Sequence, residues 1–164
     1  MTNTPQKILD ELNSLGFTHA TGVPDTIMKN FILCLDNDKR FKHFIANREG
    51  EAVAIASGAY LANKKCFVYM QNMGIGDITN CILSLNNLSQ IPLLLFISWR
   101  GEKGKDSIET IETGLKTENM LAKLGLKLYK FDKNKIPALI KMVNESVEKN
   151  RKCTAILVSW GDLD

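Results

Sequence analysis

Short apolar runs alternate with segments of helical periodicity along this chain. The apolar runs predict strands at 17–21, 43–47, 66–71, 93–98, 126–131 and 154–159. Apolar residues at helical spacing predict helices at 5–15, 26–36, 50–63, 75–88, 117–124 and 134–149. Runs such as Leu93–Ser98 are apolar at every position but the last, which is typical of strands buried on both faces. The pattern predicts an α/β fold with a single doubly wound, mostly parallel sheet of about six strands and helices on both faces.

In a parallel sheet of this kind, ligands meet the loops at the carboxyl ends of the strands. The loops that follow the predicted strands are 22–25, 47–50, 71–76 and 99–114. The stretch Gly101–Thr113 is polar and has no clear apolar face, so we expect a functional or mobile loop there. No internal repeat or low-complexity tract interrupts the pattern, and we expect a single domain over residues 1–164.

Composition excludes several classes of function. The net charge of +3 is too small to indicate nucleic-acid binding, and the lysines between 102 and 152 predict a solvated surface. The four cysteines form no C-x-x-C pair, so no metal site is predicted. The histidines, His19 and His43, lie within predicted strands, which argues against a Ser-His-Asp hydrolase. The longest apolar run, Ile91–Trp99, is too short to span a bilayer, and Met1–Leu12 does not resemble a signal peptide, so we expect a cytoplasmic protein.

Two carboxylates, Glu49 and Glu51, lie where a strand gives way to an alanine-rich helix. Acidic side chains at a helix start interact favourably with the helix dipole, and this accounts for Glu51. Glu49 lies nearer the strand end, where its side chain can point into a cleft, and it is therefore the first candidate for proton transfer. Helix-start electrostatics is the alternative for Glu49 as well.

Three further loop positions could bind a ligand, and each has a structural alternative. Gly74 and Gly76 could let the backbone approach an anion at a helix start. The third glycine of a dinucleotide fingerprint is missing, because position 79 is Thr79, and a tight turn is the alternative explanation for both glycines. Arg100 follows a strand and could hold a carboxylate, phosphonate or sulfonate, or could form a structural ion pair. Asp25 is either a helix cap or a site carboxylate.

The loops together form an ordered set of motifs. They are Gly22-Val23-Pro24, the segment from Arg48 to Ala59, the segment from Gln71 to Asn80 that contains Gln71-Asn72-Met73-Gly74-Ile75-Gly76, and Ser98-Trp99-Arg100-Gly101. The set resembles the pyrimidine-binding domain of thiamine-diphosphate-dependent 2-oxoacid decarboxylases, over roughly residues 8–160. Within that class it is similar to phosphonopyruvate decarboxylase and to the alpha subunit of sulfopyruvate decarboxylase.

The resemblance implies a role for individual residues. In the family, a glutamate nine positions before a helix glycine contacts N1′ of the aminopyrimidine of thiamine diphosphate, and Glu49 stands in that relation to Gly58. The implied cofactor-binding residues are Gly22, Val23, Pro24, Asp25, Glu49, Gln71, Asn72 and Gly74. Asn72 and Arg100 are the implied substrate-binding residues, with Arg100 at the anionic end of the substrate.

Two departures from the family pattern limit what the resemblance implies. The diphosphate and magnesium motif is missing, because Gly76-Asp77 is followed too soon by Asn86-Asn87 and Gly161-Asp162 lies at the end of the chain. A beta subunit is therefore expected to hold the diphosphate and Mg²⁺, in a hetero-oligomer with alpha–alpha or alpha–beta interfaces. Asp106–Thr110 also lacks the histidine of the relatives, which leaves the 2-oxoacid open. The alternative to a split decarboxylase is a non-catalytic nucleotide- or metabolite-binding α/β module.

Overall fold

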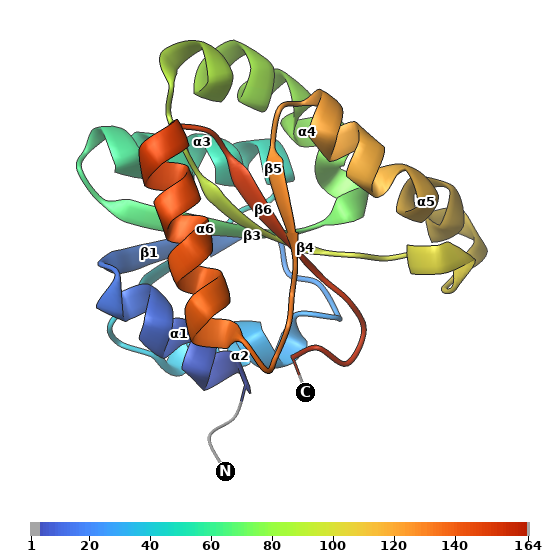
Figure 1. The fold of residues 1–164 in the computed structure, drawn as a ribbon, viewed down its shortest axis with the longest axis horizontal. Coiled ribbons are helices and arrows are strands. Elements are labelled where there is room, and N and C mark those ends of the chain that lie inside the picture. The colour runs from blue at the N-terminus through green and yellow to red at the C-terminus, as the bar shows by residue number, and fades with distance from the viewer. Residues whose placement is uncertain (1–3, 164) are drawn as a thin grey trace.

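A parallel sheet occupies the centre of the computed structural model, which describes residues 4–163 (Figure 1). Within these residues the sheet has six strands in the order β2-β1-β3-β4-β6-β5, and all neighbouring pairs are parallel. The strands are β1 (Phe17–Gly22), β2 (Lys42–Ile45), β3 (Lys65–Gln71), β4 (Leu94–Ser98), β5 (Lys127–Lys130) and β6 (Thr154–Val158). The predicted parallel α/β sheet is confirmed.

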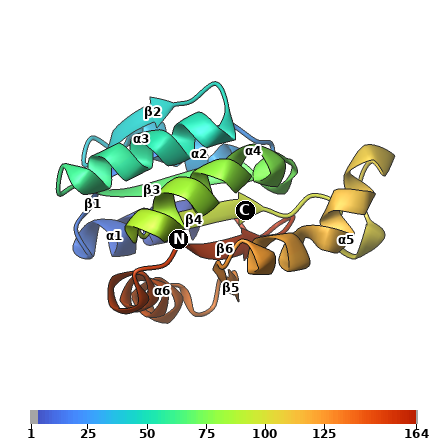
Figure 2. The same ribbon diagram turned by 90° about the horizontal axis from the view of Figure 1, so that it is seen from above.

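Helices cover both faces of the sheet. They are α1 (Thr4–Ser14), α2 (Lys29–Asn37), α3 (Glu49–Leu61), α4 (Ile75–Asn80), α5 (Ile108–Lys123) and α6 (Ile136–Asn150). The π-helix η2 (Cys81–Asn87) continues α4, and η1 (Asn72–Gly74) and η3 (Glu102–Gly104) are 3-10 turns. Figure 2 shows α3 and α4 on one side of the sheet and α6 on the other. None of the helices described has both the length and the apolar character that crossing a membrane requires.

The core is divided into two parts by the sheet. Residues of α1, α2 and α6 form one buried cluster, and residues of α3, α4 and α5 contribute to the other. Phe67 of β3 lies at the centre of the first cluster, with 0% of its surface exposed. Its ring contacts those of Phe31 and Phe96 at centroid distances of 5.9 and 5.7 Å, and those of Phe17 and Phe41 at 6.3 and 5.9 Å. Packing of this kind holds β3 against α2 and against the neighbouring strands β1 and β4.

Two sequence predictions were wrong in detail. The segment 101–113 was expected to be a loop, with a helix only from 117, but α5 already begins at Ile108. Its inward-facing positions before 118 are Thr110, Gly114 and Thr117, which are small or polar, so they gave no apolar pattern. The apolar positions that predicted the helix at 75–88 include Leu88, but its side chain is 79% exposed. The π-helix adds a residue to the turn before it, which rotates Leu88 outward.

The aromatic cluster leads to a prediction about stability. Replacing Phe67 by Ala removes a fully buried ring and should lower the free energy of unfolding by about 3–5 kcal/mol. Phe44, which is 46% exposed, is the control, and its replacement by Ala should cost less than about 1 kcal/mol. Urea denaturation of both variants measures the difference. Equal losses in the two variants would contradict the assignment of Phe67 to the core.

Candidate functional site

The sheet order brings the predicted ligand loops together at one edge. Strands β1, β3 and β4 are neighbours in the sheet, although α2, β2 and α3 separate β1 from β3 along the chain. Because the strands are parallel, the loops after Gly22, Gln71 and Ser98 leave the sheet at the same edge. Glycine is required at the end of β1, since a Cβ atom on Gly22 would lie 2.1 Å from the carbonyl oxygen of Tyr69. The next residue, Val23, donates its backbone N–H to that same carbonyl at 3.2 Å.

Glu49 is the first residue of α3, and its side chain is half-buried beside η1. A Cβ atom on Gly74 would lie 2.3 Å from Cδ and 2.6 Å from Oε1 of Glu49. A larger residue at 74 would therefore displace the carboxyl group. The structure brings together two of the predicted cofactor-binding residues, and it explains why one of them is glycine.

Asp25 does not cap α2, because this helix begins at Lys29 with Met28 in the cap position, and not at 26 as predicted. Asp25 Oδ2 accepts the backbone N–H of Ile27 at 3.0 Å, in the turn before the helix. Its Oδ1 accepts a hydrogen bond from Nε2 of Gln71 at 2.7 Å, which joins the loops after β1 and β3. An open hollow of about 460 Å³ lies beside this pair. It is lined by Pro24, Asp25, Thr26, Lys29, Ile32, Leu33 and Gln71.

Asn72 is fully buried, and its amide group is engaged within the protein. Its Nδ2 donates to the carbonyl oxygen of Arg100 at 2.9 Å and to Oγ1 of Thr117 at 2.8 Å. Its Oδ1 accepts the backbone N–H of Arg100 at 3.1 Å. Asn72 therefore fixes the backbone after β4 and the middle of α5 to the end of β3. Direct contact between Asn72 and a ligand stays a prediction.

The Arg100 side chain lies in an ion pair with Asp106. Its Nη2 donates to Oδ1 at 2.8 Å, and its Nε donates to Oδ2. The guanidinium lies 5.4 Å from the ring centroid of Trp160, whose Nε1 donates to the same carboxylate at 3.3 Å. The Arg100 guanidinium holds the pKa of the Asp106 carboxyl well below its usual range. An external anion that binds through Nε and Nη2 of Arg100 would have to displace Asp106.

Asp77 was not among the predicted site residues. In the sequence, Gly76-Asp77 was considered only as a match to the diphosphate motif, and that match fails. Asp77 Oδ2 accepts the backbone N–H of Gly50 at 2.7 Å, and Oδ1 pairs with the Arg48 guanidinium. These partners flank Glu49 on both sides. No signal was available in the sequence, because the predicted helix began at 50 and left Glu49 in the cap position. The structure begins α3 at Glu49 and places Arg48 in the cap position, where it makes no side-chain cap bond.

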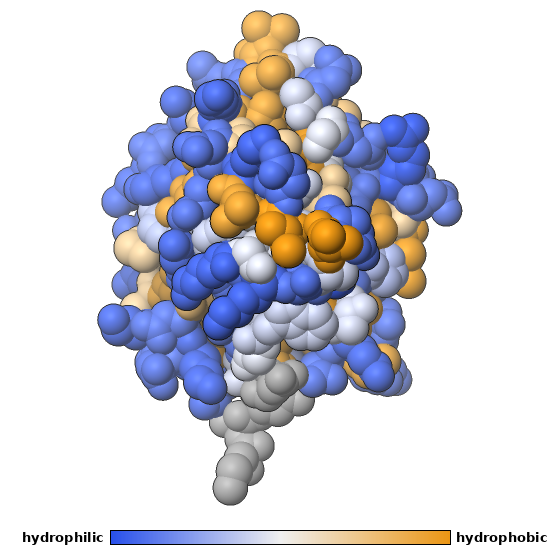
Figure 3. Space-filling view, turned by 90° about the vertical axis from the view of Figure 1, so that its right-hand side faces the viewer, coloured by the Kyte–Doolittle hydropathy of each residue, from blue (hydrophilic) through white to orange (hydrophobic). Residues whose placement is uncertain are grey.

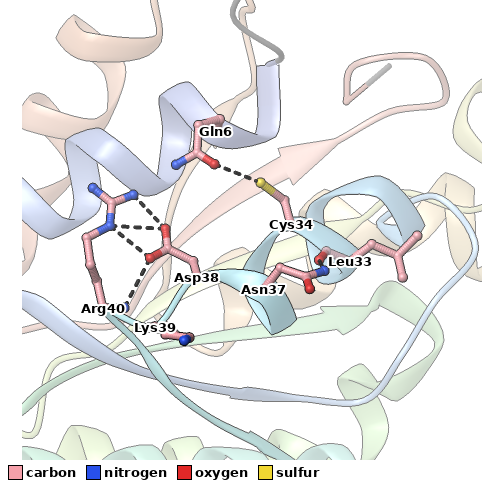
Figure 4. Close-up of a pocket in the computed structure, with 7 residues that line it drawn as sticks. All are labelled: Gln6, Leu33, Cys34, Asn37, Asp38, Lys39 and Arg40. Carbon is pink, nitrogen blue, oxygen red and sulfur yellow. Dashed lines mark hydrogen bonds and ion pairs between the residues drawn. The ribbon is translucent and has the colours of Figure 1, made fainter.

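Other polar clusters lie outside this edge. The hollow in Figure 4, about 600 Å³ in volume, lies between α1 and α2, and its Asp38 and Arg40 are paired with each other. His43 bridges Asp36 Oδ1 at 2.6 Å and the Tyr69 hydroxyl at 2.7 Å. In residues 4–163, no group of three or more His, Cys, Asp or Glu side chains is arranged to hold a metal ion.

Comparison with known proteins gives the class of protein. The family model described as thiamine pyrophosphate enzyme, N-terminal TPP binding domain, matches residues 2–121, and the chain belongs to this family. Benzoylformate decarboxylase from Polynucleobacter necessarius has the same fold, with a TM-score of 0.77 and 20% identity, covering 100% of this chain and 31% of that one.

Individual relatives are more similar in sequence. The sulfopyruvate decarboxylase subunit alpha of Methanocaldococcus jannaschii is 37% identical over 123 residues, which cover 75% of this chain and 73% of the relative. Phosphonopyruvate decarboxylase of Streptomyces viridochromogenes is 34% identical over 94 residues, or 57% of this chain. The match spans only 24% of that longer protein.

The buried Asn72 leads to the second prediction. Replacing it by Ala leaves the backbone groups of Arg100 and the Thr117 hydroxyl without their partner, and should lower the free energy of unfolding by about 3 kcal/mol. Asn134, an exposed residue, is the control, and its replacement by Ala should change stability by less than about 0.5 kcal/mol. Chemical denaturation measures both. A loss below about 1 kcal/mol at Asn72 would refute the proposed tie between β3, β4 and α5.

Proposed function

We propose that this chain is the alpha subunit of a thiamine-diphosphate-dependent 2-oxoacid decarboxylase that acts on sulfopyruvate or phosphonopyruvate. The observation that carries the proposal is Glu49, a half-buried carboxylate in contact with Gly74 at the edge where the ligand loops meet. Membership of the thiamine pyrophosphate enzyme family supports the cofactor. The substrate class is supported by the names of the similar proteins, sulfopyruvate decarboxylase subunit alpha and phosphonopyruvate decarboxylase.

Glu49 would hold a proton at N1′ of the aminopyrimidine. When bound, thiamine diphosphate supplies a nucleophilic carbon and accepts the electron pair that is released as carbon dioxide leaves. The protein's contribution is to orient this ring and to control its proton. Gly74 permits the close approach of η1 to the Glu49 carboxyl group, and the bonded pair of Asp25 and Gln71 offers polar groups beside the hollow after β1.

Arg100 is the proposed anchor for the sulfonate or phosphonate group of the substrate. Its guanidinium already binds a carboxylate through two nitrogen atoms, so its donors are arranged for an anion with two acceptor oxygens. The ring of Trp160 lies over the guanidinium and limits its movement. The substrate anion would replace Asp106 at this position.

We propose that a beta subunit completes the site and holds the diphosphate and Mg²⁺. The names of similar proteins, which are called subunit alpha, support the existence of a partner subunit. Ile108 and Leu115 of α5 are 87% and 60% exposed, and Trp160 is 55% exposed, so apolar surface is available for a partner. Figure 3 shows apolar side chains gathered on this side of the molecule, and Figures 1 and 2 show α5 extending beyond the sheet.

The four cysteines are unpaired thiols, which supports a cytoplasmic location.

A second candidate function is a non-catalytic module that binds a nucleotide or metabolite. The pairing of Arg100 with Asp106 favours it, because the proposed substrate anchor is already occupied. The two candidates differ in one measurement, which is carbon dioxide release by the chain together with its beta subunit.

The prediction concerns Glu49. In the complex, Glu49→Gln should lower carbon dioxide release from sulfopyruvate or phosphonopyruvate by about 10²-fold or more, because the amide cannot exchange a proton with the ring. Assembly with the beta subunit should be unchanged, as measured by size-exclusion chromatography. Pyruvate, which lacks a sulfonate or phosphonate group, should be turned over less efficiently than either substrate.

Glu51→Gln is the matched control for this experiment. Glu51 lies two residues further along α3, and its Oε2 accepts the backbone N–H of Asn47 at 2.8 Å, a bond that a glutamine oxygen can also accept. This variant should retain activity within about threefold of the unmodified complex. Near-normal turnover by Glu49→Gln would overturn the proposed mechanism, and the absence of carbon dioxide release from the unmodified complex would favour the binding module.

A further inference from the structure

The carboxylate of Asp77 holds the backbone on both sides of Glu49. Asp77 lies in the first turn of α4, whereas Glu49 begins α3, so the contact joins the starts of two helices. Oδ2 accepts the Gly50 N–H at 2.7 Å and Oδ1 pairs with the guanidinium of Arg48. These two partners hold the pKa of Asp77 below its usual value, with the Gly50 bond as the larger cause, so the carboxylate stays ionised.

Asp77 replaces a cap that α3 lacks. The N-cap residue of a helix usually accepts the N–H of the second or third helical residue through its own side chain. Here the N-cap is Arg48, which makes no such bond, and the second helical residue is Gly50. Asp77 therefore satisfies from another helix a donor that would otherwise have no partner in the protein. Gly50 suits this approach, since a Cβ atom there would lie 3.1 Å from Asp77 Oδ2.

The same short segment also touches the Glu49 side chain. Gly74, three residues before Asp77, leaves the space in which the Glu49 carboxyl group lies. Cys81, one turn after Asp77 on the same continuous helix, donates its thiol to the Gly50 carbonyl at 3.6 Å. One segment, 74–81, thus contacts the side chain of Glu49 and both polar backbone groups of the next residue.

We propose that Asp77 is a positioning residue that fixes the direction of the Glu49 carboxylate toward the aminopyrimidine. The inference rests on the proposed function, because it assumes that Glu49 acts on the cofactor. A group that transfers a proton must be held within a fraction of an ångström of its working position, and an error of about 1 Å can cost 10²-fold in rate. The start of a helix without its own cap would not hold Glu49 this tightly.

Metal binding and a simple helix-dipole interaction both fit the contacts of Asp77 less well than positioning does. A role as a metal ligand has no support, because its carboxylate is bonded to Gly50 and Arg48 and belongs to no metal-ligand group among the described residues. A favourable interaction with the dipole of α4 alone would leave the carboxylate free to point to solvent. Instead 21% of the Asp77 side chain is exposed, against 75% of the Arg48 side chain.

These exposures set the order of importance of the two bonds. An ion pair with a mostly exposed arginine contributes little, because water and salt screen it. The contact with the Gly50 N–H should therefore carry most of the positioning. It follows that Arg48→Ala should have a weaker effect than Asp77→Ala.

The first test uses the chain alone and measures amide hydrogen exchange. Asp77→Ala should speed exchange at Gly50 by about fivefold or more, because the N–H loses its acceptor. Asp77→Asn keeps an acceptor oxygen and should leave that rate within about twofold. Ala52, whose N–H bonds to the Arg48 carbonyl at 3.1 Å, serves as an internal reference for general opening of the helix.

The second test measures kcat and KM of the complex with its beta subunit. Asp77→Ala should lower kcat by about tenfold or more and leave the substrate KM within about threefold, since Asp77 acts on the position of Glu49 and not on the substrate. Asp77→Asn and Arg48→Ala should keep kcat within about threefold. Should the alanine variant fail to fold, Asp77→Ser, whose hydroxyl is too short to reach Gly50, should give the same pattern.

Asp38→Ala is the matched control for both tests. Asp38 also pairs with an arginine, Arg40, and accepts that residue's backbone N–H at 3.1 Å, but it lies in the hollow between α1 and α2 (Figure 4). Its loss should change neither Gly50 exchange nor kcat. A kcat for Asp38→Ala as low as that of Asp77→Ala would show that general destabilisation, and not positioning, causes the loss.

Two outcomes would overturn the inference. Unchanged Gly50 exchange in Asp77→Ala would refute the cap, whatever the activity of the complex. Faster exchange with an unchanged kcat would refute the positioning role. If the unmodified complex releases no carbon dioxide, the proposed function fails separately, and the exchange rates still decide whether Asp77 caps α3.

Discussion

The close contact between the start of α3 and the segment 74–81 decides where Glu49 lies. A glycine at 74 is necessary for this contact, because a Cβ atom there would overlap the Glu49 carboxyl group. Asp77 completes it by accepting the N–H of Gly50. The carboxylate that is proposed to act on the cofactor is therefore held by a neighbouring segment as well as by its own helix.

The parallel sheet places this contact among the other site residues. Because β3 lies between β1 and β4, the loops that carry Asp25, Gln71 and Arg100 leave the sheet side by side. Asp25 and Gln71 are joined by a hydrogen bond, and the buried Asn72 fixes the backbone of Arg100. Rigidity at this edge thus comes from contacts between loops that are far apart in the sequence.

Periodicity in the sequence was enough to predict the strands, most helices and the parallel sheet, because buried strands such as β4 are apolar at every position but the last. It could not predict the start of α5, since this helix packs through Thr110, Gly114 and Thr117, which are small or polar. A Cβ atom on Gly114 would lie 2.2 Å from the carbonyl oxygen of Gly101, so packing there depends on the absence of a side chain. The cap supplied by Asp77 joins two helices, and no local pattern contains such a bond.

The most direct test of the role of Glu49 is an experimental structure of this chain with its beta subunit and thiamine diphosphate. We expect a Glu49 carboxyl oxygen to lie within hydrogen-bond distance, about 2.6–3.2 Å, of N1′ of the aminopyrimidine. We also expect Asp77 still to accept the Gly50 N–H. An aminopyrimidine bound elsewhere on the chain, or a Glu49 side chain turned away from the ring, would contradict this role.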